Sequence, residues 1–256
     1  MKRPLFAVLS AIVLIAMLLG ACAPAATTAP AAKTKVRVAT DATYPPFESV
    51  DDQTKQLVGF DIDLMNAVAQ KANFDVEFIN INFDALLAGM GTCQFDLGIS
   101  ATTITEDRKK TMLFSDGYIN AGQIVSVQKS NTTINSKDDL KGKKIGVQIS
   151  TTGAIEAAKI QGATVKTYDT VDLAFLDLAN GQVDATIVDS PTTYNYVAKM
   201  SDKIKTVGDV FTDEQYGVIG CKTKADLIAQ VNTALAALKS EGYLTTLTDK
   251  WLKTAK

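Results

Sequence analysis

The chain has 256 residues, with 26 lysines and arginines, 28 aspartates and glutamates, and no histidine. The lack of histidine excludes Ser-His-Asp and Cys-His catalysis and every histidine-ligated metal site, and the nearly balanced charge provides no basic field for nucleic acid. The length suits one large domain or two small ones, and we expect no metal, no cofactor and no nucleic-acid partner.

Residues 1–21 have the pattern of a secretory signal peptide. Two basic residues precede an apolar stretch over residues 5–19, which is shorter than the roughly 20 residues that a membrane-spanning helix needs. The order Leu19-Gly20-Ala21-Cys22 resembles the cleavage site of bacterial lipoproteins, in which the cysteine becomes the first residue and carries a lipid. We expect a lipid anchor at Cys22 that holds the protein outside the cytoplasmic membrane, in the periplasm or at the cell surface. An ordinary secretory signal with an incidental cysteine is the alternative.

Residues 22–34 follow as a spacer. Within it, residues 23–32 consist of alanine, proline and threonine only. Such a stretch buries too little apolar surface to fold, so we expect a flexible tether between the membrane and the folded part.

From residue 35 onward, apolar β-branched runs alternate with helical patterns. A first group of strand, helix, strand, helix and strand predicts a parallel sheet covered by helices, and the pattern then starts again. The expected strands are residues 36–39, 76–79, 95–100, 124–127, 144–148, 163–168, 185–189 and 216–221. The expected helices are residues 61–71, 84–90, 136–140, 152–160, 170–178, 224–238 and 243–252.

Residues 83–100 and 172–189 share one order of features: a helix, a glycine-containing turn, an apolar residue, an aspartate and a buried strand. This repeat indicates two similar α/β lobes. In open α/β sheets, ligands bind beyond the carboxyl ends of the strands. The segments that end these two strands are therefore the expected ligand loops, namely Ser100 to Thr103, which includes Ala101, and Asp189 with Ser190.

The polar groups at the strand ends suit a zwitterionic ligand. Arg108 can hold a carboxylate through two parallel hydrogen bonds, and Asp189 can accept hydrogen bonds from an ammonium group. Residues 150–153 lie between a strand and a helix, where backbone N–H groups and hydroxyls can hold an anion. Both charged residues also have a purely structural explanation, because Arg108 precedes two lysines, as on a solvated helix face, and Asp189 stands where a helix cap would.

Several motifs resemble those of the family 3 extracellular solute-binding proteins, which supply polar amino acids to ABC importers. The motifs occur in the family's order and cover essentially all of the chain after the spacer. They are residues 41–48, 59–64, 103–108, 139–148 and 184–189. One position departs from the pattern, because Ser150 stands where the family often has glycine.

The resemblance implies an α/β, two-lobed periplasmic-binding-protein fold of type II, with each lobe a mainly parallel sheet flanked by helices. Lobe 1 is expected to comprise residues 35–118 and 208–256, and lobe 2 residues 119–207. Two hinge crossovers, near residues 117–120 and 208–209, are expected to let the lobes close on the ligand. We expect a monomer that docks on a membrane permease.

By its motifs, the resemblance assigns the ligand's carboxylate to Arg108, with Thr103 and Thr152 in support. It assigns the ligand's α-ammonium group to Asp189. These assignments follow the family, and the residues alone only suggest them.

The resemblance also implies that Tyr44 and Phe83 pack on the ligand's side chain and that Asp41 reaches its polar end. Packing in the core is the alternative for the two aromatic residues, and capping of a turn is the alternative for Asp41. Gln148 ends a strand next to residues 150–153 and is a further candidate contact. Asp41 with Gln148 suits a cationic or amide side chain, since an acidic ligand would meet a like charge. We therefore expect arginine, lysine or glutamine as the ligand.

Two other functions compete with transport. A cyclohexadienyl dehydratase has a similar scaffold, but it needs a catalytic acid, and the sequence places none clearly beside the predicted ammonium site. A ligand sensor that acts on a membrane receptor is the other alternative. We expect a binding protein and not an enzyme.

Cys93 and Cys221 are the remaining cysteines in a compartment where disulfides persist. In the implied topology, the strand at 216–221 runs antiparallel to the strand at 95–100, so the end of one lies near the start of the other. A disulfide between Cys93 and Cys221 would then attach the C-terminal segment to lobe 1. Two buried free thiols are the alternative.

Overall fold

The computed structural model describes residues 33–253. The predicted signal peptide, the lipid anchor at Cys22 and nearly all of the predicted spacer lie outside these residues. Within residues 33–253, no helix has the length and apolar character that spanning a membrane requires. The two sheets described below belong to one compact unit that begins at Thr34.

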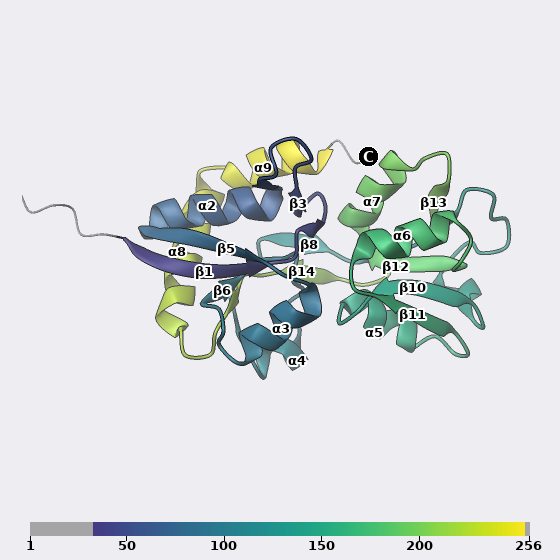
Figure 1. Cartoon of the computed structure of the whole chain (residues 1–256), viewed down its shortest axis with the longest axis horizontal. Coiled ribbons are helices and arrows are strands. Elements are labelled where there is room, and N and C mark those ends of the chain that lie inside the picture. Colours follow the sequence, from purple (N-terminus) through teal and green to yellow (C-terminus); the bar gives the residue numbers. More distant parts are fainter. Residues whose placement is uncertain (1–32, 254–256) are drawn as a thin grey trace, which may run out of the picture. The chain divides into compact units, whose positions relative to one another are not determined.

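The first sheet has the strand order β5-β1-β6-β15-β7. Strands β5, β1 and β6 are parallel, whereas β15 runs antiparallel to both β6 and β7. Figure 1 shows α2 and α9 on one side of this sheet and α3 and α4 on the other. Its strands are β1 (Thr34–Thr40), β5 (Phe74–Asn80), β6 (Leu97–Gly98), β7 (Leu113–Phe114) and β15 (Ile219–Gly220). Its helices are α2 (Phe60–Ala72), α3 (Phe83–Gly91), α4 (Glu106–Lys109), α8 (Ala225–Ser240) and α9 (Tyr243–Trp251).

The second sheet has the order β11-β10-β12-β9-β13. Strands β11, β10 and β12 are parallel, and β9 runs antiparallel to β12 and β13. Helices α6 and α7 lie on one side of it and α5 on the other (Figure 1). Its strands are β9 (Gln123–Gln128), β10 (Lys144–Gln148), β11 (Thr164–Tyr168), β12 (Ala185–Asp189) and β13 (Ile204–Val207). Its helices are the short 3₁₀ helix η1 (Lys137–Leu140), α5 (Thr152–Ala158), α6 (Val171–Ala179) and α7 (Ser190–Lys199).

Two crossing segments connect the sheets. They contain β8 (Ile119–Ala121) and β14 (Glu214–Tyr216), which pair antiparallel with each other. A separate small sheet consists of β2 (Thr43–Tyr44), β3 (Glu48–Val50) and β4 (Leu57–Val58). The α/β two-lobed prediction is confirmed, but both sheets are mixed. Each contains a strand that returns from a crossover in the opposite direction, and the sequence periodicity carries no information on strand direction.

The predicted single strand at 216–221 was wrong. Tyr216 pairs with Ile119 in the crossover, whereas Ile219 and Gly220 join the first sheet. The change of partner occurs at Gly217, where a Cβ atom would lie 2.9 Å from side-chain atoms of Ile104. The continuous apolar run from 216 to 221 therefore reflects burial in two neighbouring places, not one strand.

Local signals set the helix ends. The Thr105 side chain accepts a hydrogen bond from the backbone of Arg108 and caps α4. Ser136 caps η1 in a capping box with Asp139, at the start of the helix predicted over residues 136–140. Helix α2 has two aspartates in its first turn and ends at Asn73 in the left-handed conformation, the common C-terminal geometry.

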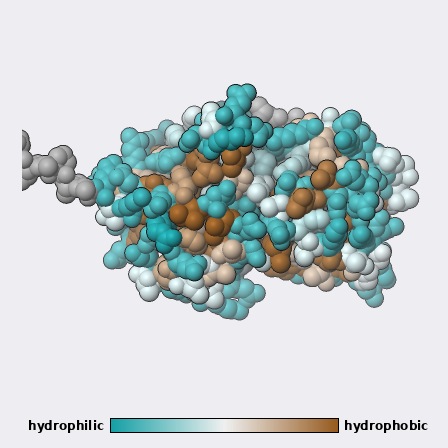
Figure 2. All heavy atoms as spheres, viewed as in Figure 1, coloured by the Kyte–Doolittle hydropathy of each residue, from teal (hydrophilic) through white to brown (hydrophobic). Residues whose placement is uncertain are grey.

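The core of the first lobe contains a cluster of aromatic rings beside the crossover. The Phe47 ring lies 5.1 Å from that of Tyr216 and 5.8 Å from that of Phe60, both edge to face. Tyr118 contacts the rings of Phe60 and Tyr216. Figure 2 shows that hydrophilic residues cover much of the viewed face, with apolar residues visible over the first sheet. Phe78 of the edge strand β5 is one of the partly buried apolar residues packed against this core.

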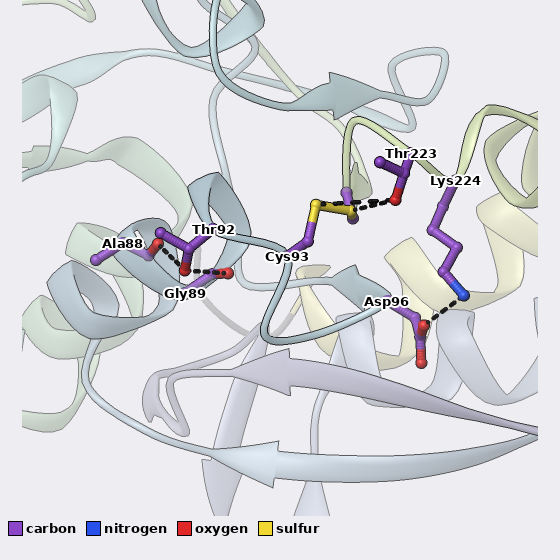
Figure 3. The surroundings of a disulfide bond; sticks show 8 residues. Ala88, Gly89, Thr92, Cys93, Asp96, Thr223 and Lys224 are labelled. Carbon is purple, nitrogen blue, oxygen red and sulfur yellow. Dashed lines mark hydrogen bonds and ion pairs between the residues drawn. A yellow bond between two sulfur atoms is a disulfide. The ribbon is translucent and has the colours of Figure 1, made fainter.

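A disulfide joins Cys93 to Cys221, which have Cα atoms 5.0 Å apart and a sequence separation of 128. Figure 3 shows Cys93 just beyond α3, opposite the segment that carries Thr223 and Lys224. Lys224 also forms an ion pair with Asp96 at 3.0 Å. The bond therefore attaches the start of the C-terminal helices to the first sheet.

Removing this bond should lower stability, because the closed loop is long. We expect the Cys93→Ser/Cys221→Ser protein to lose roughly 2–4 kcal/mol of unfolding free energy in urea titrations. Wild type unfolded in reductant is the matched control and should behave like the double variant. Two free thiols in denatured, unreduced protein would contradict the prediction.

Candidate ligand-binding site

A cavity lies where the carboxyl ends of β1, β10 and β12 face each other. All nine residues that the sequence predicted as ligand contacts line it. From the first lobe come Asp41, Tyr44, Phe83, Ser100, Ala101, Thr103 and Arg108, and from the second come Gln148, Thr151, Thr152 and Asp189. The structure thus brings the predicted residues together, and their contact with a ligand stays a prediction.

Arg108 reaches across the cavity between the two lobes. Its Nη1 donates to the Thr103 carbonyl at 2.8 Å and its Nη2 donates to the Ser150 carbonyl at 3.0 Å. The guanidinium also lies 5.4 Å from the centre of the Phe83 ring. Among the ion pairs of residues 33–253 none includes Arg108. Burial lowers the pKa of Arg108, which remains a charged group in the lining of the cavity.

Asp189 ends β12 in the wall opposite Arg108. Its Oδ2 accepts a hydrogen bond of 2.5 Å from the Tyr44 hydroxyl, and its buried Oδ1 has no partner within the described residues. The side chain does not cap α7, so the helix-cap explanation fails. Burial, and then the nearby charge of Glu214, raise the pKa of Asp189 to about 6. At neutral pH it is therefore mainly ionised, and its Oδ1 is left to accept a further hydrogen bond.

Asp41, which directly follows β1, accepts hydrogen bonds from the turn at Thr43, from the start of α3 and from the end of β10. Its Oδ2 accepts from the backbone N–H of Phe83 at 3.1 Å and from Nε2 of Gln148 at 2.7 Å. Its Oδ1 accepts from the Thr43 hydroxyl at 2.8 Å, which is the turn contact that a structural role would predict. Burial raises the pKa of Asp41, while these hydrogen bonds oppose the shift. The bond to Gln148 crosses from the first lobe to the second.

Glu214 is a site residue that the sequence analysis missed. Its Oε2 accepts from the hydroxyls of Thr103 at 2.7 Å and Thr152 at 2.8 Å. Its Oε1 accepts from the Thr212 hydroxyl at 2.8 Å and from Nε2 of Gln123 at 3.2 Å. The buried carboxylate on the crossover strand β14 therefore contacts both lobes. Its only sequence signal was an acidic residue just before an apolar run.

These contacts change what Thr103 and Thr152 can offer a ligand. A hydroxyl has one proton to donate, and both hydroxyls point theirs at Glu214. The Thr152 oxygen in addition accepts from Nε2 of Gln123 at 3.0 Å. In this arrangement neither hydroxyl has a proton left for a ligand carboxylate, which is the group that the resemblance assigned to them.

Replacing Glu214 by glutamine should preserve the fold, because the two threonine hydroxyls can turn and accept from the new amide. We expect the affinity for an amino acid to fall about tenfold, since one negative charge near the ammonium site is lost. The pKa of Asp189 should also fall, because the charge of Glu214 helps to raise it. Calorimetric titrations across pH should therefore show the acid-side loss of binding at a lower pH than in wild type. An unchanged pH profile would contradict this role.

Two α/β sheets joined by two crossovers, with a polar cavity between the carboxyl ends of their strands, define the two-lobed periplasmic-binding-protein class. Residues 36–254 match the bacterial extracellular solute-binding proteins, family 3, and the chain belongs to this family.

Known relatives include proteins named for several different ligands. The chain is 35% identical over 247 residues to a putative ABC transporter arginine-binding protein 2 of Escherichia coli strain K12, covering 94% of this chain and 98% of the relative. It is 34% identical over 216 residues to the L-cystine-binding protein TcyJ of the same strain, covering 84% and 81%. An ancestral arginine-binding protein, solved with bound arginine, has a TM-score of 0.82 at 39% identity and covers 86% of this chain and 98% of its own.

These relatives are binding proteins, and the family is one of extracellular solute-binding proteins. The chain is therefore a solute-binding protein that acts outside the cytoplasm, and not an enzyme. The expectation of a binding protein is confirmed, and the dehydratase alternative is set aside.

Proposed function

We propose that the protein captures a basic L-amino acid, arginine or lysine ahead of glutamine, and delivers it to an ABC importer. The observation that carries the proposal is that Arg108 from the first lobe, Asp189 from the second and Asp41 all line one cavity. Arg108 would hold the ligand carboxylate, Asp189 its ammonium group and Asp41 its side-chain cation.

The balance of charge around the cavity favours a basic ligand. One guanidinium, Arg108, stands against three buried carboxylates, Asp41, Asp189 and Glu214. A neutral zwitterion leaves this excess of negative charge in place, whereas a basic side chain offsets part of it. An acidic side chain near Asp41 would meet a like charge at a cost of several kcal/mol.

A ligand must replace contacts that now join the two lobes. Tyr44 with Asp189, Asp41 with Gln148, and Arg108 with the Ser150 carbonyl are direct hydrogen bonds across the cavity. The space left between them holds about one water molecule. Opening at the crossovers would admit the amino acid, and its own charged groups would then take over these hydrogen bonds.

The location and the partner are part of the proposal. The lipoprotein-like sequence ending at Cys22 supports attachment to the outer side of the cytoplasmic membrane, and the following spacer supports a tether. The relatives named for ABC transporters support a membrane permease as the partner.

Calorimetric titration of the mature protein with each of the twenty amino acids tests the ligand. We expect tight binding of arginine or lysine, weaker binding of glutamine and none of glutamate. Tighter binding of an uncharged or acidic amino acid would overturn the charge argument. Uptake of labelled arginine by cells that lack the protein separates transport from sensing, because a sensor's loss would leave uptake unchanged.

A further inference from the structure

Glu48 and Asp61 form a buried pair of carboxyl groups beneath the ligand loop. Glu48 lies on β3 and Asp61 in the first turn of α2, and both side chains are fully buried. Glu48 Oε2 and Asp61 Oδ1 are buried without a hydrogen-bond partner within the described residues, while the other oxygen of each acid binds the consecutive residues Ser100 and Ala101. The two acids are close enough for each to shift the pKa of the other. Within residues 33–253, no ion pair includes either residue. Two adjacent buried carboxylates without a cation would repel strongly, so the pair must hold a proton.

The other hydrogen bonds show which residue carries the proton. Asp61 Oδ2 accepts from the backbone N–H of Ala101 at 2.7 Å and from the Tyr118 hydroxyl at 2.9 Å. Glu48 Oε1 accepts one hydrogen bond, from the Ser100 hydroxyl at 3.0 Å. The carboxyl group that accepts more hydrogen bonds keeps the charge. Glu48 is therefore the donor and Asp61 the carboxylate.

We propose that Glu48 and Asp61 share one proton and that this pair positions the ligand loop at Ser100 and Ala101. Through Ser100, the pair also reaches the binding site, since the Ser100 Oγ accepts from the backbone N–H of Asp41 at 3.0 Å. Ala101 has a φ of 42°, a conformation that is unfavourable for a residue with a side chain. The hydrogen bond to Asp61 holds it there.

Neither acid touches the cavity, so both are positioning residues, and their effect on affinity rests on the proposed function. Among the residues that the structure describes, the charged and polar groups that face the pair include no cation that could neutralise it in place of a proton. The carboxylate of Asp41 is a further negative charge near Glu48, and Tyr118 and Ser100 are neutral hydrogen-bond donors. On α2, Asp63 faces away from the pair and binds Lys250. Burial and the neighbouring acid raise the pKa of Glu48 well above its usual range.

The shared proton can be observed without any ligand. At about pH 8, ordinary carboxyl groups are ionised. We expect the infrared spectrum of wild type to retain the C=O stretching band of a protonated carboxyl group, and Glu48→Gln to lack it. Asp189→Asn is the control and should retain the band. A wild-type spectrum without the band, or a band that persists in Glu48→Gln, would overturn the assignment.

Unfolding equilibria provide a second, independent test. A group whose pKa is raised in the folded state stabilises the protein fully below its unfolded pKa and loses this contribution as pH rises toward the folded pKa. Above the usual glutamate pKa, the folding constant of wild type should therefore fall relative to that of Glu48→Gln by up to about tenfold per pH unit. Groups other than the pair cancel in this ratio. A ratio that stays constant from pH 5 to pH 8 would exclude the shared proton.

Ligand affinity tests the positioning role. Glu48→Gln keeps a donor for Asp61 and an acceptor for Ser100, so the affinity should stay within about threefold of wild type. Glu48→Leu removes both and should weaken binding at least about tenfold while Arg108 and Asp189 remain. Equal affinities of the two variants would overturn the positioning role. If wild type binds no amino acid, the proposed function fails, and the infrared band still decides the shared proton.

Discussion

Replacing Arg108 by alanine is expected to weaken amino acid binding by about 100- to 1000-fold, equivalent to roughly 3–4 kcal/mol. The guanidinium lines a cavity whose other charged lining residues are acids, so its loss leaves the ligand carboxylate near Asp189 and Glu214 without a cation. Titration calorimetry with the best ligand of the wild-type protein measures the loss directly.

Two further variants separate charge from geometry. Arg108→Lys keeps the charge but cannot form two parallel hydrogen bonds, so we expect about tenfold weaker binding than wild type. Lys109→Ala removes the neighbouring exposed charge, which pairs with Glu106, and should leave binding unchanged. Loss of affinity in Lys109→Ala equal to that in Arg108→Ala would show that general charge, not the position of Arg108, attracts the ligand.

Several residues around the cavity could be predicted from the sequence because they lie at the ends of strands. Asp41, Gln148 and Asp189 each come at or just after the end of a buried strand, and the carboxyl ends of parallel strands meet at one edge. Arg108 was found differently, through its place in a motif, since its helix is only four residues long. Periodicity alone would have left it on a solvated surface.

Other residues of the site could not be found in this way, because their role depends on a contact between distant segments. Glu214 contacts Thr103 and Thr152, which lie 111 and 62 residues away in the sequence. The contact between Glu48 and Asp61 behind the site was hidden for the same reason. In the sequence, Asp61 is an acid in the first turn of a helix, which normally indicates only a favourable interaction with the helix dipole. Only the fold reveals that both acids are fully buried, and the proposed shared proton is argued from this burial. The break in the run 216–221 was missed because two different sheets bury its two halves.

Asp189→Asn is expected to weaken binding by about 100-fold at neutral pH, because the ammonium group loses its charged acceptor. Wild type should also lose affinity as pH falls through about 6, where Asp189 becomes protonated in the absence of ligand. The variant has no such group, so its weak affinity should stay flat across this range. Asp184→Asn is the control, since Asp184 is exposed and binds the backbone of Lys144.

The same substitution should make the ligand-free protein more stable at neutral pH. Asp189 has a raised pKa when folded, so its stabilising contribution is complete only below the usual aspartate pKa and is lost as pH rises through about 6. Keeping it ionised therefore costs on the order of 2–3 kcal/mol, which asparagine avoids. Urea unfolding at neutral pH should show the variant gaining stability while it loses binding. If Asp189→Asn is instead less stable than wild type, the charge of Asp189 stabilises the fold through its hydrogen bond with Tyr44, and the expected gain in stability is wrong.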